Sequence, residues 1–89
     1  MSYKVEYTRT AFKQLKKMDK KIAAFIISFI EEKLVGCENP RLFGKALQGV
    51  LNDKWRYRIG DYRILAKIED DILIIIVVEL GHRKDIYNK

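Results

Sequence analysis

The residues of this chain best suited to chemistry are arginines that recur at alternate positions of one short segment and reappear in the next. Arg56 and Arg58 are two residues apart, and Arg63 follows a Gly60-Asp61 pair. Side chains two residues apart on a β-strand share a face, and a Gly-X pair is typical of a two-residue hairpin turn. Such a turn would place Arg58 directly opposite Arg63. Because a guanidinium binds phosphate oxygens in a bidentate fashion, the pattern predicts a phosphate-binding surface.

The C-terminal segment, residues 81–87, adds groups that could complete such a site. It contains Arg83, Tyr87 and His82, which is the only histidine of the chain. A further cation could hold the charge that develops on a phosphate, while a phenol or an imidazole could transfer protons in an in-line displacement. A plainer interpretation is structural, with Ile86 and Tyr87 packed against the domain and with His82 and Arg83 at the surface without a role.

Length and composition limit the kinds of protein that this sequence can encode. Eighty-nine residues, 48% hydrophobic and 34% charged, predict one folded domain over residues 1–89 rather than a disordered chain. One cysteine, Cys37, allows no internal disulfide, and one histidine argues against a structural zinc site. We therefore expect no metal and no cofactor. The sequence shows neither a signal peptide nor an apolar run of membrane-spanning length, so we expect a cytoplasmic protein that does not engage a membrane.

The chain is basic, since 18 Lys+Arg against 12 Asp+Glu give a net charge of +6. This balance favours a polyanionic partner, which could be RNA, DNA or an acidic protein. The candidate RNA-binding residues are Lys54, Arg56 and Lys67 on predicted strands and Lys13, Lys16, Lys17, Lys20 and Lys21 on predicted helices. For the helical lysines, a solvated surface without a ligand is about as good an interpretation.

Periodicity predicts a strand followed by two helices in the first 36 residues. Residues 3–7 alternate as a half-buried strand does. Thr8 is suited to cap a first helix, and Asp19 is suited to cap a second helix that ends at Gly36. The predicted buried positions recur at helical spacing and are Phe12, Leu15 and Met18, then Ile22, Phe25, Ile26, Phe29, Ile30 and Leu34. The two helices are expected to form a hairpin.

Three further strands are predicted at residues 54–59, 62–69 and 72–80, with residues 41–51 irregular. A tight turn at Asp70-Asp71 would close the second hairpin and set Arg63 opposite Val78. The fold class is therefore α+β: an N-terminal strand, a helical hairpin, then a three-stranded antiparallel meander with the helices packed on one face of the sheet. The last strand should be interior because it is so rich in β-branched residues. Counting chain reversals makes the first strand antiparallel to the strands at 54–59 and 72–80.

This register divides the side chains between two faces of the sheet. The face under the helices would collect Trp55, Tyr57, Ile59, Tyr62, Ile64, Ala66, Ile68, Leu73, Ile75 and Val77. The other face would hold the basic residues among apolar ones, with no Asp or Glu placed to neutralise them. Because like charges opposite one another repel, this local conflict indicates a functional surface.

Four strings of the sequence carry a resemblance to a known family. They are K-Q-L-K-K-M-D at residues 13–19, K-A-L-Q-G at 45–49, W-R-Y-R-I-G-D-Y-R at 55–63 and L-G-H-R-K-D-I-Y at 80–87. With them the chain resembles, over essentially its whole length, the RelE family of toxins in the RelE/ParE superfamily. The resemblance implies a toxin neutralised by a cognate, RelB-like antitoxin. It also implies an mRNA interferase that enters the ribosomal A site and cleaves the message without a metal, by attack of the RNA 2′-hydroxyl on the adjacent phosphate.

The resemblance also suggests roles for individual residues. The family's basic strand residues match Arg56, Arg58 and Arg63, its arginine after the last strand matches Arg83, and its C-terminal tyrosine matches Tyr87. The best-known member has lysine at positions 56 and 58, and arginine is a poorer proton donor because of its higher pKa. His82 is therefore a further candidate for proton transfer. A different activity remains open, because ParE-like relatives share the fold but poison DNA gyrase by binding.

Overall fold

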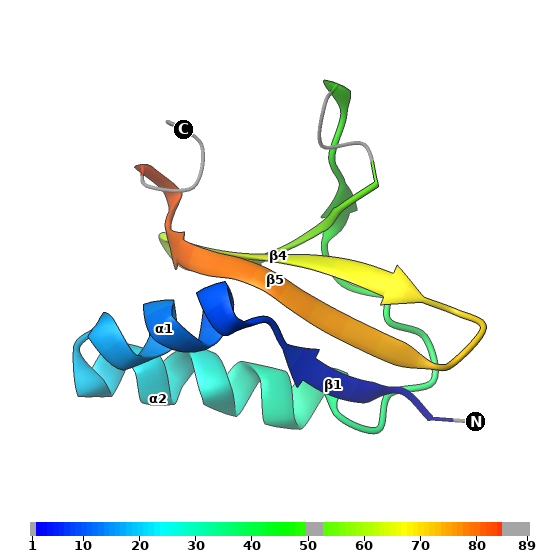
Figure 1. Ribbon diagram of the computed structural model, residues 1–89, viewed down its shortest axis with the longest axis horizontal. Helices are drawn as coiled ribbons and strands as arrows, with labels where there is room; N and C mark the ends of the chain where they lie inside the picture. The colour runs from blue at the N-terminus through cyan, green and yellow to red at the C-terminus, as the bar shows by residue number, and fades with distance from the viewer. Residues whose placement is uncertain (1, 50–52, 85–89) are drawn as a thin grey trace.

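The computed structural model describes residues 2–49 and 53–84, which form one layer of helices packed under a twisted, mixed β-sheet (Figure 1). The elements are β1 (Lys4–Tyr7), α1 (Arg9–Lys17), α2 (Lys20–Phe29), the π-helical turn η1 (Ile30–Leu34), β2 (Lys45–Ala46), β3 (Trp55–Ile59), β4 (Tyr62–Glu69) and β5 (Ile74–His82). The sheet has the strand order β1-β5-β4-β3-β2. The predicted α+β class, with both helices on one face, is confirmed.

The caps of both helices are those that the sequence predicts. The Thr8 side chain accepts a hydrogen bond from the backbone N–H of Ala11, and the Asp19 carboxylate accepts one from Lys21. Gly36, at a φ of 77°, follows η1 and has the left-handed conformation that ends many helices. The second helix therefore runs as far as expected, although its last turn is π-helical.

The buried face of α1 differs from the predicted one. Ala11 is fully buried, with Leu15 and Met18 packed beside it, whereas Phe12 is 52% exposed. The small Ala11 packs into the core, and the Phe12 ring lies outside it, with the Lys16 ammonium 4.9 Å from the ring centre. Phe25 of α2 is likewise exposed, at 59%, and its predicted core position is wrong.

The position of β1 corrects the predicted strand directions. β1 pairs with β5 and runs parallel to it, with Val5 opposite Ile75. The cause is β2, a strand of two residues in the segment predicted to be irregular, which pairs antiparallel with β3. This strand adds one reversal of the chain, and each later strand therefore runs opposite to the predicted direction relative to β1.

The register of β5 also differs from the predicted one. Residues 70–73 form a loop of four residues in place of the two-residue turn, and Glu69 pairs with Ile74. A β-bulge then interrupts the ladder, because Ala66 pairs with Val77 whereas Leu65 pairs with Glu79. The loop shifts the register by two residues and the bulge by one more, and Arg63 consequently lies opposite Gly81 rather than Val78.

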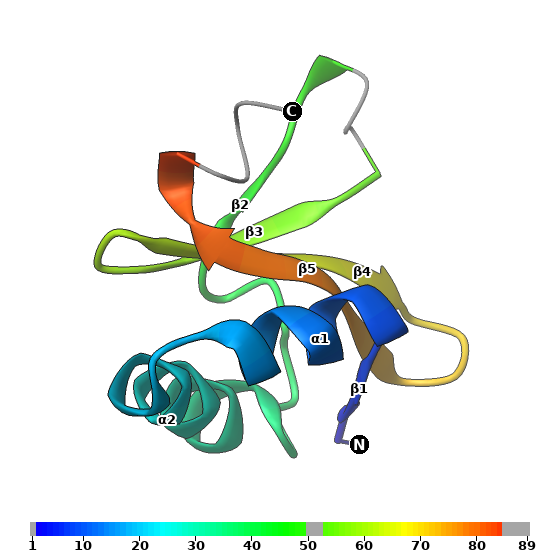
Figure 2. The same ribbon diagram turned by 60° about the vertical axis from the view of Figure 1, so that its left-hand side comes forward.

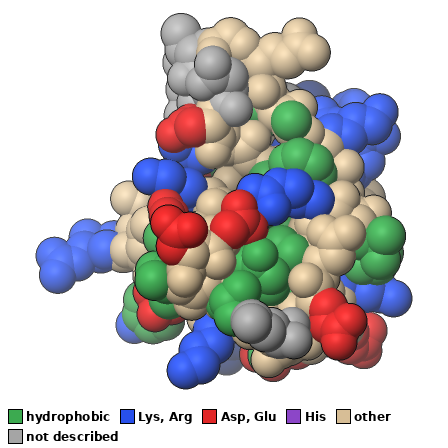
Figure 3. Space-filling view, turned by 90° about the vertical axis from the view of Figure 1, so that its right-hand side faces the viewer, with side chains coloured by type: hydrophobic (Ala, Val, Ile, Leu, Met, Phe, Trp, Pro, Cys, Tyr) green, Lys and Arg blue, Asp and Glu red, His purple; other side chains and the backbone are tan. Residues whose placement is uncertain are grey.

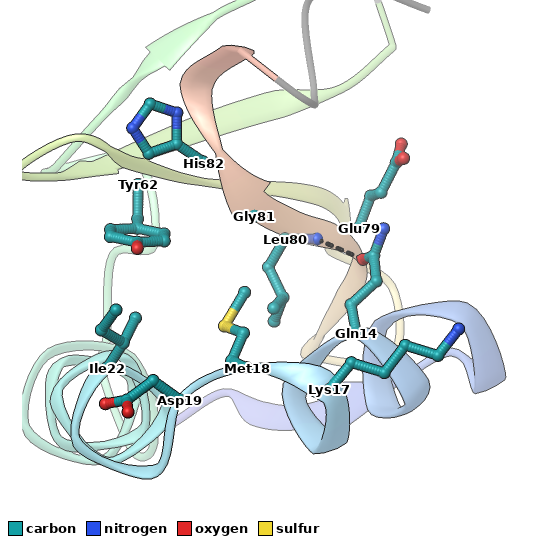
Figure 4. Close-up of a pocket in the computed structure, with 10 residues that line it drawn as sticks. All are labelled: Gln14, Lys17, Met18, Asp19, Ile22, Tyr62, Glu79, Leu80, Gly81 and His82. Carbon is teal, nitrogen blue, oxygen red and sulfur yellow. Dashed lines mark hydrogen bonds between the residues drawn. The ribbon is translucent and has the colours of Figure 1, made fainter.

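The bulge reverses the faces of the last four residues of β5, and α1 stabilises it. The bulge turns the Leu80 side chain into the core and the Glu79 side chain away from the core, as Figure 4 shows. The Thr8 hydroxyl donates to the carbonyl of Val78 at 2.8 Å, and the Gln14 side-chain oxygen accepts from the N–H of Leu80, also at 2.8 Å. Backbone groups freed by the bulge are thus satisfied by the helix beneath it.

The sheet's two faces have distinct contents. The helix-facing side is defined by the buried residues Tyr57, Ile59, Ile64, Ala66, Ile75, Val77 and Leu80. The opposite side, here named the arginine face, is defined by Arg56, Arg58, Arg63, Leu65, Lys67, Ile76, Glu79 and Gly81. The predicted division of β3 and β4 is confirmed, but the expectation that no acid shares the arginine face is wrong. Glu69 lies two residues after Lys67 on β4 and forms an ion pair with it, and the bulge places Glu79 on the same face.

Side-chain contacts hold the segment between η1 and β2 against the end of the sheet at the β4–β5 loop. Arg41 forms a bidentate ion pair with Asp70, at 2.9 and 3.0 Å, and the Tyr3 hydroxyl donates to the same carboxylate. These partners, Arg41 first, hold the pKa of Asp70 below its usual value. Tyr57 donates its buried hydroxyl to the carbonyl of Pro40, and burial raises its pKa. Figure 3, which views this end of the molecule, shows acidic and basic side chains next to one another.

Candidate phosphate-binding site

Three of the predicted arginines converge at the end of the sheet where β3 turns into β4. Arg58 and Arg63 lie directly opposite one another across the hairpin, as predicted, on either side of the Gly60-Asp61 turn. The backbone N–H of Arg83 donates to the carbonyl of Asp61 at 2.8 Å. This bond ties the end of β5 to the turn, and the ribbon views show the two side by side (Figures 1 and 2). The structure therefore brings together the backbones of Arg58, Arg63 and Arg83.

The three arginines differ in exposure. Arg58 and Arg83 are exposed, and neither forms an ion pair with another residue in the described ranges. Arg63 is only 5% exposed, and one terminal nitrogen of its guanidinium donates to the carbonyls of Gly60, at 2.8 Å, and Tyr62, at 3.0 Å. Arg63 therefore holds the turn from inside, which the sequence did not predict.

Arg63 nevertheless keeps unused donor capacity. Its Nε is buried and has no hydrogen-bond partner among the described residues. A guanidinium has five N–H groups, and the carbonyls of the turn engage only one of its nitrogens. Gly81, the cross-strand neighbour of Arg63, is itself buried.

His82 does not lie with the arginines. The bulge turns it to the helix-facing side, where its ring meets Tyr62 edge to face with centroids 5.4 Å apart. Its Nδ1 accepts a hydrogen bond from the N–H of Lys84 at 3.2 Å. Figure 4 shows His82 and Tyr62 above a cavity of about 320 Å³ between the end of β5 and the α1–α2 turn, with Met18 and Ile22 below.

The predicted lysines are dispersed. Lys54 pairs with Asp53 at 2.9 Å and Lys67 pairs with Glu69 at 3.3 Å, so each of these strand cations has a local counter-charge. The helical lysines are all exposed, with Lys13, Lys16 and Lys17 on α1 and Lys20 and Lys21 on α2. Tyr87 lies outside the described residues.

A second cavity, of about 280 Å³, adjoins the arginines and was not predicted from the sequence. It lies beside β3, and its lining residues are Phe29, Phe43, Gly44, Lys45, Arg56, Tyr57 and Arg58. The sequence signal that could have revealed it is the Phe43-Gly44-Lys45 string in the segment predicted to be irregular. β2 ends its pairing with β3 at Lys45, so the outer edge of β3 at Arg58 has no strand partner among the described residues.

No group of three or more His, Cys, Asp or Glu side chains within residues 2–49 and 53–84 is arranged to hold a metal ion. In the same ranges no helix is both long and apolar enough to span a membrane.

Comparisons with known proteins identify the class of protein to which this small α+β domain with an arginine-bearing sheet face belongs. A family model described as "ParE toxin of type II toxin-antitoxin system, parDE" matches residues 5–87. "Toxin RelG" of Mycobacterium tuberculosis is 33% identical over the whole of both chains, and "Toxin RelE" of the same organism is 32% identical over 96% of this chain and 86% of its own. The chain belongs to the RelE/ParE family of toxins from type II toxin-antitoxin systems.

Solved structures agree with the sequence matches. The RelBE2 toxin-antitoxin complex of M. tuberculosis contains a chain that superimposes with a TM-score of 0.84 at 30% identity, covering 93% of both chains. A mutant of Escherichia coli toxin RelE in the free state superimposes with a TM-score of 0.75 at 21% identity, over 99% of this chain and 93% of that one. At this level of identity, the match to E. coli RelE shows agreement in fold only.

Proposed function

We propose that this toxin is a ribosome-dependent endoribonuclease that cleaves mRNA in the A site. The observation that supports this activity best is the convergence of Arg58, Arg63 and Arg83 at one end of the arginine face. Two exposed arginines whose backbones adjoin that of a third, buried arginine could together bind a phosphate whose negative charge grows during the reaction. The curated relatives named RelG and RelE support the RelE-type activity over gyrase poisoning.

The proposed reaction uses the RNA's own nucleophile. The 2′-hydroxyl attacks the adjacent phosphorus, the bond to the 5′-oxygen of the next nucleotide breaks, and the products carry a cyclic or 3′-phosphate and a 5′-hydroxyl. Arg58 and Arg83 would bind the non-bridging oxygens, and Arg63 would add charge beneath them. Arg56 would hold a neighbouring phosphate.

Proton transfer is assigned to Tyr87, by resemblance to the family. His82 is left out of the reacting groups because its ring contacts Tyr62 on the helix-facing side. With few groups of its own to move protons, the toxin would depend on the ribosome to align the message for in-line attack. The exposed helical lysines, together with Lys54 and Lys67, would contact ribosomal or messenger RNA through its phosphates.

The proposed partners are therefore the ribosome and a cognate antitoxin, both met in the cytoplasm. Related toxins have been solved as complexes with antitoxins, among them RelBE2 of M. tuberculosis and RelB-RelE of Methanococcus jannaschii. A RelB-like antitoxin for this chain should be acidic, at least locally, because the toxin carries a net charge of +6.

Gyrase poisoning is the second candidate function, because the family model that matches the chain is described as a ParE toxin. The two are separated by adding the purified toxin to a translating extract and mapping mRNA ends by primer extension, with a gyrase supercoiling assay in parallel. We expect new 5′ ends within translated codons and unchanged supercoiling. Inhibited supercoiling with intact messages would contradict the proposal and favour the ParE-type activity.

A further inference from the structure

The cavity beside β3 combines features that the phosphate-binding role of the arginines does not require. Its inner wall is aromatic, with Phe29 contributed by α2 and Phe43 by the segment before β2. Phe43 is 38% exposed although it is a large hydrophobic residue, and the Lys33 ammonium lies over one face of its ring, 5.7 Å from the ring centre, which leaves the other face for a base. The cations Lys45, Arg56 and Arg58 lie at the same cavity. Aromatic surfaces beside cations are the combination with which proteins bind unpaired nucleotides.

Backbone contacts with β3 hold the part of the cavity wall formed by Phe43 and Gly44 in place. The Trp55 indole donates to the carbonyl of Phe43 at 2.7 Å, which anchors that residue to β3. At Gly44, whose φ is 81°, a Cβ would lie 2.2 Å from the carbonyl oxygen of Arg56. Only glycine permits this approach, which brings Phe43 next to the edge of β3.

The size of the cavity restricts its occupant. Its volume of about 280 Å³ is just below the range of roughly 300–1,000 Å³ that encloses drug-sized ligands. A single planar base fits this space better than a whole nucleotide does. The cations would then meet the phosphates on either side of the base.

We propose that this cavity binds one unstacked base of the mRNA, next to the scissile phosphate, with Phe43 as its stacking surface. Arg58 belongs both to the cavity and to the converging arginines, so the inserted base and the reacting phosphate belong to the same or neighbouring nucleotides. The inference rests on the proposed RNA-cleaving function. It adds a subsite through which the toxin would favour particular bases at one position.

The variants that test this subsite are Phe43→Leu, Phe43→Tyr and Phe25→Leu. Phe43→Leu keeps an apolar side chain and the backbone bond to Trp55 but removes the ring. Phe43→Tyr keeps a ring. Phe25→Leu is the matched control, because Phe25 is an exposed phenylalanine of α2 that does not line the cavity.

The first experiment measures cleavage on programmed ribosomes at subsaturating toxin. The messages carry a single abasic nucleotide placed in turn at each position around the cleavage site. We expect one position at which the abasic substitution slows the wild-type toxin roughly 5- to 150-fold, the range of one base–aromatic stacking contact. Phe43→Leu should slow cleavage of the intact message by a similar factor and be insensitive to the abasic substitution there. Phe43→Tyr, which keeps a ring, should keep the sensitivity to the abasic substitution at that position, and Phe25→Leu should behave as wild type.

Additive effects of Phe43→Leu and the abasic substitution at every position would overturn the inference while leaving the cleavage activity established. So would wild-type rates for Phe43→Leu.

A second experiment does not depend on cleavage. A short RNA with a fluorescent 2-aminopurine and a 2′-deoxy sugar at the cleavage position is titrated with each protein. Fluorescence quenching that Phe43→Leu weakens and Phe25→Leu retains supports the subsite, even if mRNA on ribosomes is not cleaved and the proposed function fails. Equal quenching by both variants, or no quenching with the wild-type protein, would contradict the subsite. A Phe43→Leu variant that binds the antitoxin more weakly but binds RNA as the wild type does would also contradict it.

Discussion

Removing each of the two opposed arginines of the β3–β4 hairpin should affect the stability of the domain differently, because only one of them is built into the turn. Arg63→Ala removes the donor to the carbonyls of Gly60 and Tyr62, whereas Arg58→Ala removes an exposed side chain. We expect Arg63→Ala to destabilise the domain. Arg58→Ala should leave stability unchanged or raise it.

The expected size follows from the bonds that are lost. A hydrogen bond to a charged group contributes about 1.5–3 kcal/mol, and a single nitrogen of Arg63 makes both bonds. Gly60 is exposed, so water can replace part of this interaction. Relief of the repulsion between Arg58 and Arg63 returns up to about 1 kcal/mol. The net loss should be about 1–2 kcal/mol, which for a domain of this size lowers Tm by roughly 4–16 °C.

The assay is thermal unfolding followed by circular dichroism, with wild type, Arg58→Ala, Arg63→Ala and Arg63→Met measured together. Arg63→Met keeps an unbranched apolar stem but no donor, so it should lose most of the same stability. Both alanine variants should lose cleavage activity per folded molecule. An Arg63→Ala protein that melts with the wild type would refute the assignment of Arg63 to the turn, and one that cleaves normally when folded would refute its place in the site.

Three further substitutions test the contacts that hold the helical layer and the segment before β2 against the sheet. Thr8→Val removes the cap of α1 and the donor to the bulge carbonyl of Val78, so unfolding should become easier by about 1–2 kcal/mol in urea titrations, with Thr8→Ser close to wild type. Gly44→Ala should lower stability by at least about 2 kcal/mol, because its Cβ collides with a carbonyl at positive φ. Asp70→Asn should lower Tm at neutral pH. Because the folded pKa of Asp70 is depressed, this contribution is fully present above the unfolded pKa near 3.9, and the difference from wild type should shrink as pH falls below 3.9 and vanish only below the folded pKa. A Tm difference that persists unchanged into strong acid would contradict the ion pair with Arg41.

The part of the site that could be predicted from sequence depends on local geometry. The Gly60-Asp61 turn fixes the register of its hairpin within a few residues, so the pairing of Arg58 with Arg63 was predicted correctly. The α+β class followed from the strength of the helical and strand periodicities. Both inferences use spacing alone, which a single hairpin or helix is enough to determine.

The remaining features depend on contacts between distant segments. The bulge beside Val78 exists because Leu80 gains burial and because Thr8 and Gln14 of the helical layer satisfy the freed backbone groups. Those partners lie more than 60 residues away in the sequence. The positions of Glu79 and His82 follow from the bulge, so no reading of β5 alone could place them.

The short strand β2 escaped prediction for a similar reason. Two residues have no detectable alternation, and the strand forms because the Phe43 carbonyl and Gly44 fit against Trp55 and Arg56. The strand directions and the cavity beside β3 both depend on it. The burial of Arg63 was missed because its partners are backbone carbonyls, which sequence patterns of charge do not include.

The most direct test of the proposed activity is single-turnover cleavage of a defined mRNA on purified ribosomes with an empty A site, compared with the same mRNA free in solution. The matched pair of variants is Arg58→Ala, in the site, and Arg9→Ala, an exposed arginine of α1 with the same charge change. The account predicts cleavage within the A-site codon only when ribosomes are present, new 5′-hydroxyl ends, a loss of about 10²-fold or more for Arg58→Ala and none for Arg9→Ala. Intact message on ribosomes, or equal cleavage by both variants, would contradict it.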